Sequence, residues 1–312
     1  MKEIVLITGA GGLIAQELSK KINNDFEVRF LTRNKKHEND FEWDVKRGSI
    51  DESALENVSH IIHLAGANIS EKRWTAERKK ELISSRVDSA KLLLDTVRKK
   101  NIKLKSFISA SGINYYGTVT SEKIFTENDA PGNDFLSEVV VLWERAADEF
   151  EIQNLAERVV KIRTAVVLSE KEGALKKMLP PIQYGIGSAL GTGKQYMPWI
   201  HIKDICSIYE FALKNSHING AYNANSPEHT TNENLTKQIA RIIQKPLFMP
   251  NIPGFVLKLI FGELANALLE GSRASSQKIQ NAGFRFEFPN LQNSLEDLLL
   301  KKYKIYRCKI QK

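Results

Sequence analysis

A glycine-rich stretch, "ITGAGGLIA" (7–15), holds the residues of this chain that are best suited to binding phosphate. Gly9 permits a tight turn from a strand into a helix, and Gly12 lets the backbone approach a pyrophosphate closely. The helix that follows begins with free N–H groups, which donate to phosphate oxygens. The loop residues expected to contact a dinucleotide cofactor are Gly9, Gly11, Gly12, Leu13 and Ile14. The alternative is a tight turn with a structural role alone.

The end of the second expected strand, "LTRN" (31–34), bears on which dinucleotide would bind. NAD sites place an acidic residue there, which accepts hydrogen bonds from the ribose hydroxyls. Arg33 cannot accept, but its guanidinium can clamp a 2′-phosphate, and Thr32 adds a hydroxyl donor. Lys35 and Lys36 add positive potential. The pattern therefore favours NADP(H) over NAD(H), the alternative being a solvated arginine beside a turn.

The elements that must position these residues alternate between strand and helix patterns. The expected strands are 3–7, 27–32, 41–43, 60–66, 105–111 and 159–168, and the expected helices are 13–22, 75–100 and a helix through 135–144. This order predicts an α/β fold of the Rossmann type, a doubly wound parallel sheet with helices on both faces.

The pattern changes in the C-terminal part. Residues 179–201 are rich in glycine and proline and predict an irregular segment with hairpin-like turns. The elements expected around it are helices over 204–215, 232–244, 253–272 and 288–303 and a strand over 220–226. We therefore expect two domains. The cofactor-binding Rossmann domain would comprise 1–170 plus about 200–225, and a smaller, mostly helical substrate-side domain about 171–199 and 226–312.

Composition narrows the class of protein. The chain has 312 residues, 42% hydrophobic and 26% charged, so it can bury a core. The net charge of +8 favours an anionic cofactor or substrate. The basic clusters at 98–105 and 301–312 lack an aromatic stacking pattern, so we expect solvated segments and no nucleic-acid partner.

Targeting and metal-binding signals are not evident in the sequence. The chain runs from Met1 directly into a strand pattern, and no apolar run approaches the ~18 residues of a membrane span. Cys206 and Cys308 are far apart and suggest neither a disulfide framework nor a metal site. These features predict a cytoplasmic protein without membrane or metal partners. A small-molecule substrate is expected but not identified, and a protein partner or a homo-oligomer stays open.

Nearly the whole chain resembles the extended short-chain dehydrogenase/reductase superfamily. Within it, the resemblance is to NAD-dependent epimerase/dehydratase family proteins of the SulA-like type, which carry a cell-division-inhibitor label. The matching stretches, in family order, are "ITGAGGLIA", "LTRN", "HLAGANISEKRW", "SRVDSAKLL", "SASGINYYG", "LPPIQYGIGSALGTGKQYMPWIHIKD" and "NANSPEHTTNENL".

The resemblance implies further cofactor contacts. These are Leu64, Ala65 and Gly66, which close the fourth strand, Glu81 and Arg86 on the following helix, Ser109 on the fifth strand, and Val167 near the nicotinamide. The residue types suit the role, since a glutamate can accept from a hydroxyl and an arginine can meet a phosphate or a carbonyl. The alternative for the Glu81 and Arg86 positions is an exposed pair without partners.

The same resemblance exposes a departure. Most members of the superfamily carry a Tyr-x-x-x-Lys pair for proton transfer, and the matching positions here are Leu136 and Val140, neither of which can transfer a proton. Ser111 matches the serine that orients substrate. The residues that could replace the missing pair are Tyr115 or Tyr116, His201 and Glu138, with Ser111, Tyr116 and His201 taken as the catalytic candidates.

Two functions stay open on this basis. The first is an NADP(H)-dependent oxidoreductase or epimerase acting on a small or nucleotide-linked substrate. The second is a non-catalytic NADP(H)-binding sensor or regulatory protein, which the missing tyrosine and lysine favour.

Overall fold

The computed structural model of the chain describes residues 2–310, and the side chains of residues 2–300. The side chains of the basic tail, Cys308 among them, lie outside this description. The chain divides into two compact units. The first unit comprises Met1–Tyr115, Pro131–Arg163 and Ile205–Tyr222, and the second comprises Tyr116–Ala130, Thr164–Asp204 and Asn223–Lys312. Residues 116–130, which the sequence analysis assigned to the cofactor-binding domain, belong to the second unit.

A large sheet forms the centre of the first unit. Its strands are β1 (Ile4–Thr8), β2 (Glu27–Thr32), β3 (Asp40–Asp44), β4 (Ser49–Ile50), β5 (Val58–His63), β6 (Ser106–Gly112), β8 (Val159–Thr164) and β11 (Gly220–Ala224). They lie in the order β11-β8-β6-β5-β1-β2-β3-β4. The pairs β1–β2, β1–β5, β2–β3 and β5–β6 are parallel, and β4 runs antiparallel to β3. The predicted α/β fold with a mainly parallel sheet is confirmed.

The strand order reverses beside β1, because β2 pairs with one edge of β1 and β5 with the other. In open α/β sheets the loops on the two sides of such a reversal diverge at the carboxyl ends of the strands and leave a crevice there. The glycine-rich loop follows β1, and Leu64–Gly66 follows β5, so both segments meet at this point.

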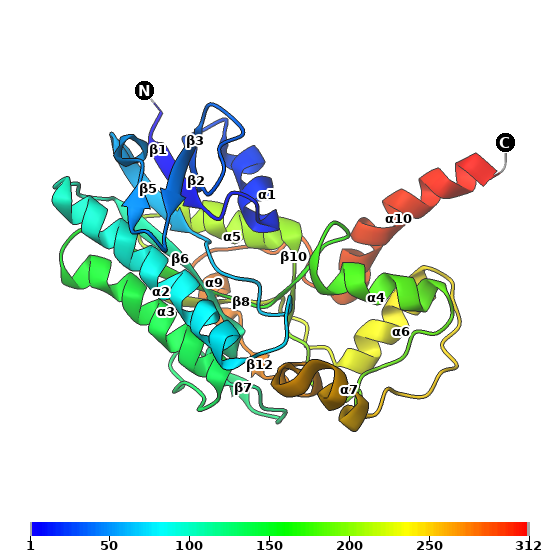
Figure 1. Ribbon diagram of the computed structural model, residues 1–312. Helices are drawn as coiled ribbons and strands as arrows, with labels where there is room; N and C mark the ends of the chain where they lie inside the picture. The colour runs from blue at the N-terminus through cyan, green and yellow to red at the C-terminus, as the bar shows by residue number, and fades with distance from the viewer. Residues whose placement is uncertain (1, 311–312) are drawn as a thin grey trace. The chain divides into compact units, whose positions relative to one another are not determined.

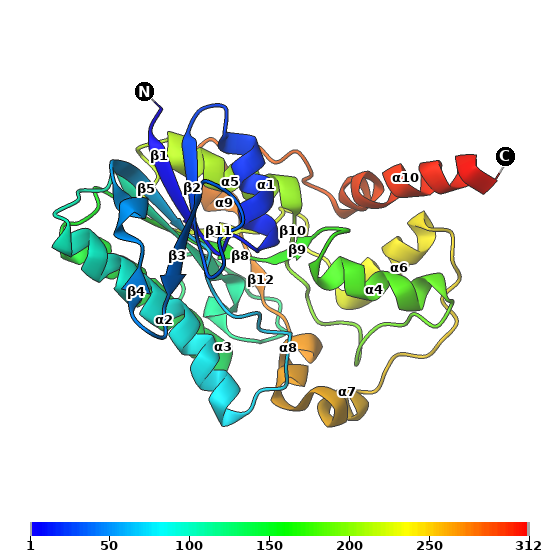
Figure 2. The ribbon, with the colours of Figure 1, turned by 45° about the horizontal axis from the view of Figure 1, so that its top comes forward.

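Helices cover both faces of the sheet (Figures 1 and 2). Helices α2 (Ala76–Lys99) and α3 (Phe135–Ile152) lie side by side on one face, and α1 (Leu13–Ile22) and α5 (Ile202–Lys214) lie on the other. Short polar side chains cap the N-termini of α2 and α3. The Thr75 hydroxyl accepts from the Arg78 N–H, and the Asp134 carboxylate accepts from the Ser137 N–H. A 3₁₀ turn, η1 (Glu52–Leu55), precedes β5, and η2 (Ile113–Tyr116) follows β6.

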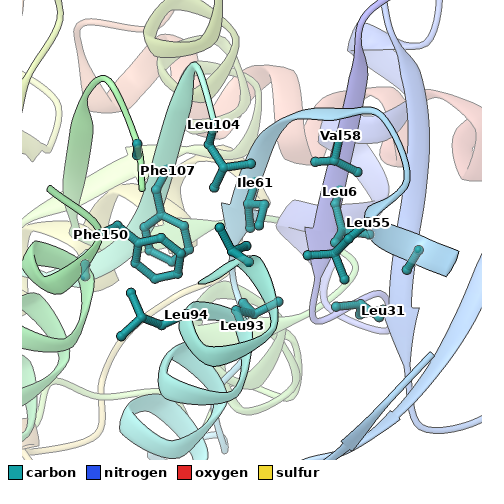
Figure 3. Packing of buried hydrophobic residues seen from close by; sticks show 14 of the residues in the cluster. Leu6, Leu31, Leu55, Val58, Ile61, Leu93, Leu94, Leu104, Phe107 and Phe150 are labelled. Atoms are coloured by element: carbon teal, nitrogen blue, oxygen red, sulfur yellow. The ribbon is translucent and has the colours of Figure 1, made fainter. Parts of the chain in front are cut away.

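Buried apolar side chains hold α2 and α3 against the sheet. Figure 3 shows Leu93 and Leu94 of α2 near Ile61 and Phe107 of the strands. The rings of Phe107 and Phe150 stack, with centroids 3.8 Å apart and planes 12° apart. Both rings are fully buried, so this stack is part of the core that joins β6 to α3.

The second unit has short strands and several helices. They are β7 (Ile124–Phe125), β9 (Val166–Leu168), α4 (Gly173–Gln183), β10 (Trp199–His201), α6 (Asn232–Ile242), α7 (Gly254–Phe261), η3 (Gly262–Leu264), α8 (Ala265–Leu269), β12 (Arg273–Ala274), α9 (Gln277–Asn281) and α10 (Leu291–Ile310). Strands β9 and β10 pair in parallel, as do β12 and β7. Within residues 2–310, we find no helix whose length and apolar character would carry it across a bilayer.

Three sequence-based expectations about elements were wrong in detail. Residues 159–168 form two strands, because the Val166 N–H bonds to the Pro198 carbonyl and β9 pairs with β10. The expected helix over 253–272 breaks at Gly262, which has φ +61° and can adopt this left-handed conformation without a Cβ clash. The segment expected to be irregular begins inside α4, whose last turn contains Pro180 and Pro181.

We expect Phe150→Ala to lower the free energy of unfolding by about 3–5 kcal/mol, because it leaves a cavity beside Phe107. Urea unfolding followed by circular dichroism measures this change. Ile152→Ala is the matched control, since Ile152 lies on the same helix but is 72% exposed, and its effect should stay within about 0.5 kcal/mol. Equal losses in the two variants would contradict the assignment of Phe150 to the core.

Candidate functional site

The turn after β1 has the geometry that the glycine pattern predicted. Gly9 has φ +75°, and a Cβ on it would lie 3.0 Å from the Leu64 carbonyl oxygen. The Gly12 N–H bonds to the Gly9 carbonyl at 2.8 Å, and Gly12 then caps the N-terminus of α1. Gly11 has open space where its Cβ would be. Leu13 and Ile14 form the half-buried first residues of α1. The turn therefore leaves room for a phosphate beside free N–H groups.

A hydroxyl group joins the ends of β1 and β5. The Thr8 Oγ1 accepts from the N–H groups of Leu64 and Ala65, each at 3.0 Å. The Leu64–Ala65 peptide that Thr8 binds is therefore also the one that a Cβ on Gly9 would meet. These contacts bring the predicted residues Leu64 and Ala65 next to the glycine-rich turn Gly9–Gly12, called the phosphate loop below, within the first unit.

The end of β2 presents an exposed arginine. Arg33 makes no hydrogen bond or ion pair with any side chain or backbone group of the described residues, so its guanidinium is open to a ligand. The Thr32 hydroxyl instead donates to the Asn34 carbonyl. Lys35 is engaged with Asp51 at 3.0 Å. Residues Lys35–Asn39 line a wide-open surface hollow of about 660 Å³.

Arg86 lies under the loop that follows β5. Its guanidinium donates to the carbonyls of Leu82 at 2.8 Å and Ala67 at 3.1 Å and lies over the Trp143 ring. A Cβ on Gly66 would come within 3.0 Å of this guanidinium. Burial, helped by the nearby charge of another arginine, lowers the pKa of Arg86 to about 10, so it stays charged at neutral pH. No carboxylate of the described residues pairs with it.

Glu81 has a partner that sequence reasoning missed. Arg78, one turn earlier on α2, is buried and donates to Glu81 at 2.7 Å. The same guanidinium donates to the Asn68 carbonyl at 2.6 Å and to Glu71 at 3.0 Å, and so ties down the loop before α2. The hydrogen bond from Arg78 lowers the pKa of the exposed Glu81 carboxyl. The i, i+3 spacing of Arg78 and Glu81 was the available sequence signal.

Ser111 faces a buried ion pair. Its hydroxyl donates to Glu144 at 2.6 Å, and the same carboxylate accepts from Arg163 at 2.8 and 2.9 Å. All three residues are buried, at most 6% exposed as whole residues. The Arg163 guanidinium also lies 3.4 Å from the centre of the Tyr115 ring. Ser109, on the same strand, is fully buried, and its hydroxyl donates to the Ala110 carbonyl.

The helix that would carry the Tyr and Lys positions is α3. Leu136 and Val140 are 3% and 4% exposed, so they belong to the core. A Cβ on Gly112, at the end of β6, would touch the Val140 side chain at 3.6 Å. Glu138, on the same helix, is exposed. No group on this stretch of α3 stands where the usual proton relay would be.

The remaining predicted residues belong to the second unit. Tyr116 is 2% exposed, donates its hydroxyl to Asn223 at 2.8 Å and stacks on Phe125. His201 is fully buried, stacks on Phe288, and its Nδ1 accepts from the Lys203 N–H. Val167 lies in β9, paired with β10. The catalytic roles of Tyr116 and His201 and the cofactor contact of Val167 stay predictions.

Comparisons with known proteins agree with this arrangement. Residues 5–224 match the model of the NAD dependent epimerase/dehydratase family, and residues 252–298 match a domain of unknown function (DUF1731). Epimerase family protein YfhF from Bacillus subtilis is 32% identical over 95% of this chain and 97% of its own length. An epimerase family protein of Staphylococcus aureus is 33% identical over 94% of this chain and 98% of its own.

A solved structure is similar over nearly its full length. The crystal structure of human epimerase family protein SDR39U1 with NADPH superposes with a TM-score of 0.85 and 29% sequence identity, covering 95% of this chain and 98% of the human one. At this similarity the two chains share their fold throughout.

We expect Arg163→Met to lower the free energy of unfolding by about 3–5 kcal/mol, because it leaves the Glu144 carboxylate buried without its ion partner. The double variant Arg163→Met, Glu144→Leu should recover most of this loss in urea unfolding. Lys20→Met is the control, since Lys20 is 64% exposed in its pair with Glu17 and should change stability by less than about 1 kcal/mol. A double variant as unstable as Arg163→Met would contradict the ion-pair explanation.

Proposed function

Because the chain belongs to the NAD-dependent epimerase/dehydratase family, we propose that it binds NADP(H) where β1, β2 and β5 end. The observation that carries the proposal is Arg33, an exposed and unpaired guanidinium at the end of β2, where an NAD site would have a carboxylate. The human relative, whose crystal structure is described as containing NADPH, supports the same cofactor. The glycine-rich turn after β1 is a second support, since a Cβ on Gly11 would meet open space, while a Cβ on Gly12 would lie 3.2 Å from the Gly9 carbonyl oxygen.

The function that fits is an oxidoreductase or epimerase acting on a small or nucleotide-linked substrate. The cofactor supplies hydride transfer when bound. The chain itself would hold the pyrophosphate with the loop after β1 and the 2′-phosphate with Arg33. Arg86, buried and without a carboxylate partner, would contribute positive charge beside Ala67.

A second candidate is a non-catalytic NADP(H)-binding sensor or regulator, with cell division as the process that the SulA-like label names. One observation favours it. Leu136 and Val140 are buried apolar residues, and the hydroxyls of Ser111 and Tyr116 already bond to Glu144 and Asn223. The hydroxyl protons of Ser111 and Tyr116 are thus already used in hydrogen bonds within the protein.

We expect NADPH to bind well ahead of NADH, and Arg33→Ala to remove most of the difference. Loss of a charge-assisted contact should cost on the order of 1.5–3 kcal/mol of NADPH binding, with little change for NADH. Fluorescence titration of both cofactors measures this. Arg98→Ala, which removes another exposed arginine near the far end of α2, should leave both affinities unchanged.

Equal affinity of the wild type for NADPH and NADH would contradict the proposed preference.

We expect Gly12→Val to abolish NADPH binding while the fold persists, because a branched side chain there blocks the approach of the backbone to the pyrophosphate. Retained NADPH binding by Gly12→Val, with the circular dichroism of the wild type, would mean that the loop is only a turn.

The second candidate predicts that protein which binds NADPH tightly turns over ordinary carbonyl and sugar-nucleotide substrates slowly or not at all. General acid–base catalysis typically contributes about 10²–10⁴-fold, and α3 offers no group to supply it. Hydride transfer, followed by NADPH absorbance against a substrate panel, tests this. Fast turnover would reject the non-catalytic candidate, and Ser111→Ala, Tyr116→Phe and His201→Ala would then identify the group responsible.

A further inference from the structure

A histidine lies directly behind the phosphate loop. His63 is the last residue of β5 and is fully buried. Its Nδ1 lies 2.9 Å from the Thr8 Oγ1 of β1, and its Nε2 lies 3.2 Å from the Ser89 Oγ of α2. Its ring also stacks beside Phe107 of β6. The side chain thus contacts two neighbouring strands and the helix that covers them.

The surrounding partners fix the direction of each hydrogen bond. The Ser89 hydroxyl has one proton and lies 2.8 and 2.9 Å from the backbone carbonyl oxygens of Ser85 and Arg86, so it can donate to one of them and accept from His63. His63 therefore carries its proton on Nε2, and its bare Nδ1 accepts from the Thr8 hydroxyl. The tautomer follows from the network as a whole.

The Thr8 hydroxyl is saturated by this arrangement. Its proton goes to His63, and its two lone pairs accept from the N–H groups of Leu64 and Ala65. Gly9, the next residue, touches that same peptide, since a Cβ on it would lie 3.0 Å from the Leu64 oxygen. The orientation of the Thr8 hydroxyl therefore sets the spacing between the two loops.

We propose that His63 is a positioning residue for the dinucleotide: by orienting the Thr8 hydroxyl, it holds the phosphate loop against Leu64–Ala65 at the spacing that the cofactor requires. This inference rests on the proposed function and adds to it a residue that contacts no ligand. It acts through a chain of hydrogen bonds that runs from α2 through β5 to β1.

The charge state of the ring agrees with this role. Burial lowers the pKa of His63 to about 4; a hydrogen bond with the Arg86 backbone opposes this shift, and the charge of Arg86 adds to it. The groups that face it from β1 and β6, Thr8 and Phe107, carry no charge. A protonated ring would direct a second N–H at the Thr8 oxygen, whose lone pairs are already used. The neutral ring is the form that the site can hold.

The test compares matched variants by NADPH titration and by thermal unfolding. Thr8→Val keeps the shape of the side chain but removes the hydroxyl, and His63→Phe removes the orienting acceptor. Both should weaken NADPH binding on the order of tenfold or more, as expected for lost buried hydrogen bonds. Thr8→Ser restores the hydroxyl and should bind NADPH within about twofold of the wild type.

His60→Phe is the control for a structural role alone. His60 lies on the same strand and is also buried, but it bonds to Ser106 and Glu3 at the opposite end of β5. It should lose stability without losing NADPH affinity. Amide exchange adds an independent readout, because the N–H groups of Leu64 and Ala65 should exchange faster in Thr8→Val and not in His60→Phe.

The outcomes separate this inference from the proposed function. A wild type that does not bind NADPH overturns both. A wild type that binds, with Thr8→Val and His63→Phe binding equally well, overturns the positioning role alone. The positioning role is also overturned if His60→Phe weakens NADPH binding as much as His63→Phe does, since a general loss of stability would then explain the effect.

Discussion

The close contact between the end of β1 and the end of β5 is the constraint on which the candidate site depends. Gly9 turns the chain at a positive φ and touches the Leu64 peptide, a distance that no larger residue would tolerate without strain. The Thr8 hydroxyl holds the same peptide from the side. Because the sheet order reverses here, the loops after the two strands diverge and leave room beside the first turn of α1.

Buried polar groups support this arrangement from the α2 and α3 side of the sheet. Arg86 and Arg78 hold the loop that follows β5, through the carbonyls of Ala67 and Asn68. The Glu144–Arg163 pair stands between α3 and β8 and accepts the Ser111 hydroxyl. A buried ion pair of this kind contributes little net folding stability, yet removing one partner lowers that stability strongly. The two charged residues therefore have to be kept or replaced together.

Leu136 and Val140 on α3, where the family resemblance predicts a tyrosine and a lysine, lie in the apolar core. The glycine-rich turn after β1 is built from β1, β5 and α1 and not from α3. A binding role and an enzymatic role are therefore two distinct proposals.

Much of the fold could be predicted from local patterns. The alternation of apolar strands and amphipathic helices gave β2 and α1 with the bounds that the structure has, and the fold class with them. The breaks were harder. The strand divides after Thr164 because the Val166 N–H bonds to the distant Pro198 carbonyl, and the helix ends at Gly262, where the backbone is left-handed. A run of apolar residues carries no information about which sheet it joins.

For the site, the sequence by itself determined the residues whose chemistry is local: the glycines of the turn after β1 and the basic Arg33 at the end of β2, whose proposed roles follow from backbone freedom and charge. Only the tertiary structure decided which polar groups are occupied. Ser111 looked available in the sequence but bonds to Glu144, thirty-three residues away. Arg78 bonds to the Asn68 carbonyl and His63 to Thr8, and the sequence indicates neither contact. The physical reason is that a hydrogen bond depends on distance and direction in space, and these are set by how strands and helices pack and not by the order of residues along the chain.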